Sequence, residues 1–187
     1  MSRKKLSLTV TLSAVALLIL CVCSPWDSFR YHGDGNFSAG GFFSHPRYVV
    51  TFSDISLNEV SEHHFRFRGL PDEEMTLVLY VKDRSVNSSE DRRPLERLKT
   101  TIEASLTDDH GKETCHGSGQ PGSGNRDGMW VLMERGDESG YWHWQCTHVR
   151  VHPNVSYTLM IRVTSAVSND EKVVVTPKLE GGGLDWP

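Results

Sequence analysis

The chain has 187 residues, of which 37% are hydrophobic, and its formal net charge is −4 at pH 7. This composition is sufficient for a hydrophobic core and argues against a wholly disordered protein. The acidic balance, with no basic stripe interleaved with aromatic residues, argues against a nucleic-acid partner.

The N-terminal residues 1–26 are predicted to direct the chain to a membrane. Basic residues at positions 3–5 precede a charge-free run, 6–26, that just reaches the length of ~20 apolar residues an α-helix needs to cross a bilayer. This pattern is typical of a retained signal-anchor or of a cleaved signal peptide. Lipidation of Cys21 or Cys23 is a weaker alternative, because a bulky residue precedes each cysteine.

A signal-anchor, a cleaved signal peptide and a lipidated N-terminus would each place the remainder of the chain outside the cytoplasm under the positive-inside rule. We therefore expect a single-pass cell-membrane protein with its C-terminal domain outside, or a secreted or periplasmic protein if the segment is cleaved. The membrane is thus an expected partner through the N-terminal segment. Residues 27–46 follow, are rich in Gly, Ser and Asn without any periodicity, and are predicted to be a flexible tether.

Residues 47–187 are predicted to form one domain of about eight antiparallel β-strands. Short runs alternate between apolar and polar residues and are separated by polar turns, which is typical of half-buried strands. The runs cover 47–57, 64–69, 75–81, 94–106, 129–134, 141–151, 156–163 and 172–177. We expect a short helical turn at the start of the 94–106 run and a loop over the Gly- and Ser-rich stretch 116–128. The fold class is therefore predicted to be an all-β antiparallel sandwich preceded by an N-terminal hydrophobic helix.

The nine histidines do not predict a metal site. His63 and His64 are adjacent and would face opposite sides of a strand, whereas Arg150 lies between His148 and His152 on one face and would repel a cation. No Gly-x-Ser-x-Gly motif or phosphate-binding loop is present. No metal, cofactor or catalytic residue is therefore expected, and the alternative is an extracytoplasmic hydrolase that uses the strand from His143 to His152.

The stretch GYWHWQCTH, residues 140–148, is the chemically densest part of the chain. Its Cys146 is expected to form a disulfide with Cys115, because these are the two cysteines outside the hydrophobic run and disulfides form in oxidising compartments. Regular pleating would place Trp142 and Trp144 on the face of Cys146 and turn His143 the other way, with an irregularity near Thr147–His148.

A binding role is the other functional expectation. Trp130, Trp142 and Trp144 lie in neighbouring predicted strands and are candidates for stacking a protein or carbohydrate ligand. Glycosylation sequons begin at Asn36, Asn87 and Asn154, which matter only in a eukaryotic secretory pathway. The expected function is binding or structural support at the cell envelope, without catalysis.

Overall fold

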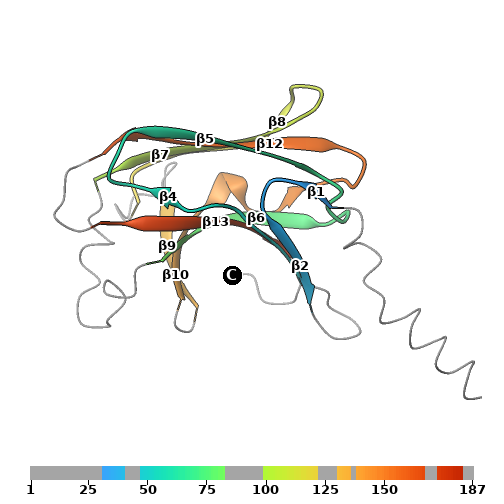
Figure 1. The fold of residues 1–187 in the computed structure, drawn as a ribbon, viewed down its shortest axis with the longest axis horizontal. Coiled ribbons are helices and arrows are strands. Elements are labelled where there is room, and N and C mark those ends of the chain that lie inside the picture. The colour runs from blue at the N-terminus through green and yellow to red at the C-terminus, as the bar shows by residue number, and fades with distance from the viewer. Residues whose placement is uncertain are drawn as a thin grey trace, which may run out of the picture.

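The computed structural model describes residues 31–40, 47–82, 99–121, 130–135, 138–166 and 172–182. These residues form two antiparallel β-sheets that pack face to face (Figure 1). The predicted all-β sandwich is confirmed, and its strands number thirteen in the described residues, because the estimate of eight omitted several short ones. The predicted N-terminal helix, the helical turn at the start of the 94–106 run and the sequon at Asn87 lie outside the described residues.

The smaller sheet, sheet A, has five strands. In spatial order they are β1 (His32–Gly33), β5 (Ser61–Arg68), β12 (Ser156–Ser165), β7 (Thr101–Asp108) and β8 (Glu113–Gly119).

The larger sheet, sheet B, has eight strands. Six follow in the spatial order β2 (Asn36–Gly40), β3 (Arg47–Thr51), β13 (Val174–Gly181), β6 (Glu74–Val81), β10 (Glu138–His143) and β9 (Trp130–Arg135), while β4 (Ile55–Ser56) pairs with β13 and β11 (Val149–Arg150) pairs with β6.

The core lies between the two sheets and is formed by alternate residues of their strands. In β12 every second residue is buried, as the sequence alternation predicts. Burying each of these side chains contributes about 1.5–3 kcal/mol. Fully buried core residues of sheet A include Ile102, Ala104, Leu159, Ile161 and Val163, and those of sheet B include Val50, Met75, Leu79, Tyr141 and Val175.

Residues 31–40 lie in the segment that we expected to be a tether, and they form two strands of the sandwich. β1 pairs with β5 in sheet A, and β2 pairs with β3 in sheet B. The turn between them, at Asp34 and Gly35, therefore crosses from one sheet to the other. Gly35 has a φ of +90°, and a Cβ atom there would lie 2.9 Å from Phe52 Cδ1, so the turn requires glycine.

The Gly- and Ser-rich stretch that we predicted to be a loop begins in a strand. β8 covers Glu113–Gly119 and pairs with β7 as the edge strand of sheet A. Glycine is tolerated in β8 because pairing with β7 holds the backbone. At Gly117 a side chain would also collide with the ring of His143. Within the described residues, no helix is both long and apolar enough to cross a membrane.

Candidate functional site

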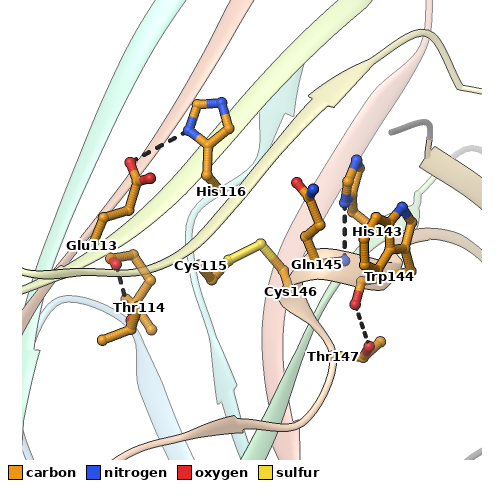
Figure 2. The surroundings of a disulfide bond; sticks show 10 residues. Glu113, Thr114, Cys115, His116, His143, Trp144, Gln145, Cys146 and Thr147 are labelled. Atoms are coloured by element: carbon orange, nitrogen blue, oxygen red, sulfur yellow. Dashed lines mark hydrogen bonds and ion pairs between the residues drawn. A yellow bond between two sulfur atoms is a disulfide. The ribbon is translucent and has the colours of Figure 1, made fainter. Parts of the chain in front are cut away.

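The disulfide that we expected is present. Cys115 of β8 is bonded to Cys146, and their Cα atoms lie 5.1 Å apart (Figure 2). Cys146 belongs to a single 3₁₀ turn, η3 (Trp144–Cys146), that directly follows β10. The bond therefore ties the edge of sheet A to the end of a sheet B strand and closes 31 positions of chain. Chain-entropy arguments assign about 3–4 kcal/mol to a loop of this size.

The predicted orientation of the side chains around Cys146 was wrong. β10 ends at His143 instead of continuing through Cys146, and the 3₁₀ turn then breaks the two-residue alternation. As a result Tyr141 and His143 face the core, whereas Trp142 faces the opposite side of sheet B. The expected irregularity near Thr147–His148 is present, since His148 has a φ of 55°.

His143 is a core residue with an exposed fraction of 0%. Its Nδ1 accepts a hydrogen bond from the backbone N–H of Gln145 at 3.2 Å, which places the proton of the neutral ring on Nε2 (Figure 2). The rings of Trp130 and His143 form a T-shaped pair with centroids 5.5 Å apart. Nε2 is buried, and no partner for it exists in the described part of the chain. An imidazole without solvent contact is not positioned to act on a substrate.

Gly117 of β8 lies directly against the His143 ring. A Cβ atom at Gly117 would lie 2.7 Å from His143 Cγ and 3.0 Å from Nδ1. Real Cβ atoms do not approach other atoms so closely, so the position of the imidazole depends on a glycine at this point in the neighbouring sheet.

The three candidate stacking tryptophans do not form one platform. Trp130 is 1% exposed, and its indole Nε1 donates to the carbonyl of Ile102 at 3.0 Å, so it belongs to the core and is not available to a ligand. Trp142 is half-buried on the outside of sheet B, and Trp144 of η3 is exposed and stacks on His143 at 6.3 Å. Trp142 and Trp144 remain candidates for ligand contact as separate side chains.

The other histidines of the predicted hydrolase strand lie on the surface beside carboxylates. His148 Nδ1 lies 3.2 Å from Glu74 Oε2, and His152 Nδ1 lies 3.2 Å from Asp72 Oδ1. Asp72 also accepts a hydrogen bond from Arg150 at 2.9 Å, which together with His152 holds the pKa of that carboxyl below its usual range. These exposed rings do not converge with the buried His143, so no observation favours the hydrolase alternative.

Across the described segments, no three His, Cys, Asp or Glu side chains gather into a group that could hold a metal ion. Of the sequons, Asn36 is exposed at the start of β2, and Asn154 is exposed in the turn between β11 and β12.

A cleft of about 470 Å³ opens at the edge of the sandwich where the turn between β1 and β2 crosses from sheet A to sheet B. This volume falls within the range of about 300–1,000 Å³ that is common for small-molecule sites. The lining contains two core phenylalanines, Phe52 and Phe65, which are 3% and 6% exposed and whose ring centroids lie 4.8 Å apart. It also contains five polar residues, which we call the rim: Asp34, Asn36, Thr51, Ser53 and His64.

Part of the rim is held in place by hydrogen bonds with β5 of sheet A. The Asp34 backbone N–H donates to the Arg66 carbonyl, and the Asp34 carboxylate accepts from the Arg66 N–H, each at 2.8 Å. On the same side, His64 Nε2 lies 2.7 Å from a Glu62 carboxylate oxygen. The Glu62 carboxylate accepts hydrogen bonds from Arg162 and from His64, and these lower its pKa below the usual range. The lining of the cleft therefore combines carboxylate, amide, hydroxyl and imidazole groups with two nearly buried phenylalanine rings.

Sequence reasoning did not find this cleft, because its polar residues lie in the segment taken as a tether and in two separate strand regions. A signal for a turn was present in the motif Gly-Asp-Gly-Asn at 33–36, since Asp and Gly are typical turn residues. The crossing of that turn between sheets, which builds the cleft, depends on tertiary contacts of Gly35 with Phe52.

Comparisons with known proteins add no relative. No protein-family model matches the chain, and a search of curated proteins finds no similar sequence.

Proposed function

We propose that this protein is a membrane-tethered, extracytoplasmic binding module that holds a small polar ligand in the edge cleft and carries out no catalysis. The observation that supports this proposal is the cleft itself, with its polar rim. Its residues come from both sheets, so the folded sandwich presents them together.

The chemistry of the rim favours a carbohydrate. Asp34 and Asn36 supply acceptors, Ser53 can both donate and accept, and His64 adds an imidazole nitrogen. Sugars carry many hydroxyl groups that need such partners. The half-buried Trp142 and the exposed Trp144 lie outside this cleft and would contribute only to a more extended ligand.

The location is proposed from the N-terminal sequence and agrees with the disulfide. The basic residues at 3–5 and the uncharged run 6–26 support insertion with the sandwich outside the cytoplasm. The Cys115–Cys146 bond is the form that cysteines take in oxidising compartments. We propose that the cell membrane is the site of action and that the sandwich supports or senses material at the envelope.

A titration with sugars tests the binding role. The full chain, purified in detergent micelles, is titrated with a panel of mono- and disaccharides while the amide resonances of Asn36, Ser53 and His64 are followed by NMR. We expect saturable shifts at these residues with at least one sugar.

Two variants show whether the cleft is responsible for the binding. Ser53→Trp fills the cleft and should abolish the shifts, whereas Val60→Trp places the same ring at an exposed position outside the cleft and should leave them unchanged. Binding that survives Ser53→Trp, or a panel that shifts no cleft resonance, would contradict the proposal.

A further inference from the structure

The edge cleft contains one residue with a full negative charge. Of the described residues that line it, Asp34 is the one carboxylate, and none is a lysine or an arginine. Asp34 is exposed and lies in the turn that joins β1 to β2, where the chain crosses from sheet A to sheet B. The charge of the lining is therefore set mainly by this aspartate.

Asp34 is fixed in position by neutral hydrogen-bond partners. Its N–H donates to the Arg66 carbonyl, its Oδ2 accepts from the Arg66 N–H at 2.8 Å, and its carbonyl accepts from the Tyr31 hydroxyl. Burial, and then the charge of Asp34, raise the pKa of Tyr31 above its usual value, so this hydroxyl stays a neutral donor. These contacts use the backbone of Asp34 and one carboxylate oxygen, which leaves Oδ1 able to accept from a ligand.

No cation neutralises Asp34 within the described residues. Arg66 meets it through its backbone N–H and carbonyl alone, and the Arg66 guanidinium is not among the groups that line the cleft. An ionised carboxylate without a counter-ion attracts positive charge. The formal net charge of −4 of the whole chain adds to this attraction.

Two other groups of charges next to the cleft are already paired. His64 Nε2 lies 2.7 Å from Glu62, and that carboxylate also accepts a hydrogen bond from Arg162 at 2.6 Å. Between β3 and β4, Asp54 forms an ion pair with Lys82. Neither group brings an uncompensated positive charge that would repel a cationic ligand at Asp34.

We propose that the ligand of the edge cleft carries a protonated amine and that Asp34 selects it. This inference rests on the proposed function, because it names the class of sugar that the cleft binds. That class is an aminosugar with a free amine, in preference to a neutral, an N-acetylated or an acidic sugar. The ammonium group donates to Oδ1 of Asp34, and the side chains of Asn36 and Ser53 are available to the hydroxyl groups of the same sugar.

The size of the preference follows from the exposure of Asp34. Because this carboxylate is open to solvent, its ion pair with the ligand is as modest as other exposed ion pairs, which corresponds to a factor of roughly two to five in affinity. Dissolved salt screens such a pair, whereas it has little effect on the hydrogen bonds of a neutral sugar. A charge-based preference should therefore decrease as the salt concentration rises.

Sugars that share one ring and differ in one substituent test the inference. The full chain, in micelles of a detergent without a sugar headgroup, is titrated near neutral pH with glucosamine, glucose, N-acetylglucosamine and glucuronate. Dissociation constants are obtained from the amide resonances of Asn36 and Ser53. We expect glucosamine to bind roughly two- to fivefold more tightly than glucose, glucuronate to bind most weakly, and the preference for glucosamine to decrease at high salt.

Two variants, each lacking one negative charge, assign the preference to Asp34. Asp34→Asn keeps a side-chain oxygen that can accept the Arg66 N–H, and it should reduce the affinity for glucosamine to that for glucose while leaving the affinity for glucose unchanged. Glu113→Gln is the matched control, because Glu113 is an exposed residue of β8, which is the edge strand of sheet A opposite β1. It should leave the preference intact.

The outcomes separate this inference from the proposed function. If glucosamine and glucose shift the cleft resonances with equal affinity, the selection of an amine is wrong and the binding role stands. A preference that persists in Asp34→Asn, or that does not change with salt, also overturns the inference. The comparison of sugars and salt on the unaltered chain decides the matter even if Asp34→Asn fails to fold. If no sugar shifts a cleft resonance, both the binding role and this inference are wrong.

Discussion

Replacing Gly117 by alanine tests how tightly the disulfide region is packed. The new methyl group would lie 2.7 Å from His143 Cγ, 3.0 Å from Nδ1 and 3.1 Å from Cβ. The ring cannot move away without loss, because its Nδ1 accepts the Gln145 N–H and the ring packs in a T-shaped pair with Trp130. The strain must therefore separate β8 from His143, close to the Cys115–Cys146 bond.

The expected cost follows from two opposing effects. Overpacking of a filled core costs about 1–3 kcal/mol, and removing the extra unfolded-state freedom of a glycine returns about 0.5–1 kcal/mol. The net loss is roughly 1–2 kcal/mol, and each kcal/mol lowers the Tm of a domain of this size by about 2–4 °C.

Urea denaturation and thermal melting of the oxidised protein measure this loss. Gly40→Ala is the matched control, because no atom lies within 4 Å of a Cβ built at Gly40 and the substitution should be neutral or slightly stabilising. Adding His143→Ala should make Gly117→Ala nearly harmless, since the double variant removes the collision. If Gly117→Ala melts like Gly40→Ala, or if its cost is unchanged in the His143→Ala background, the packing argument is refuted.

Three further predictions concern the disulfide, the core and the surface. Replacing both Cys115 and Cys146 by alanine should lower the free energy of unfolding by roughly 3–4 kcal/mol, and a loss below 1 kcal/mol in urea denaturation would show that the bond does not constrain the unfolded chain. Trp130→Phe removes the donor to the buried carbonyl of Ile102 and should cost roughly 1–3 kcal/mol in the same assay, more than Trp142→Phe at a half-buried site. The depressed pKa of Asp72 means that its pairing with Arg150 stabilises the fold above the unfolded-state pKa of about 4 and is lost as the pH falls through the lower folded-state pKa. An NMR titration of the Asp72 carboxyl should show a midpoint below that of an unfolded aspartate, and an equal midpoint would contradict the ion pair.

The sandwich could be predicted because a strand that is buried on one face alternates between apolar and polar residues in the sequence. The alternation of Tyr157, Leu159, Ile161 and Val163 records which side of β12 faces the other sheet. The disulfide could be predicted for a different reason, since Cys115 had one available partner. The first inference needs only the residue pattern within one strand, and the second needs only a count of the cysteines.

The missed elements depend on contacts between distant segments. β1, β2 and β8 are short or glycine-rich edge strands, and no local alternation marks them. Gly117 is required by His143, and Gly35 is required by Phe52, yet neither partner is near in sequence. The side chain of His143 was assigned to the wrong face because a 3₁₀ turn, stabilised by its own Nδ1, ends the strand before Cys146.

The proposal that the sandwich works outside the cytoplasm at a membrane is tested most directly by locating the full chain in cells. The chain is produced with a C-terminal tag, cells are fractionated, and protease is added to the outside of intact or outer-membrane-permeabilised cells. We predict that the tag is found with the membranes and is removed by the added protease. A full-length protein that remains soluble inside the cell, or a tag that the protease does not reach, would contradict the proposal.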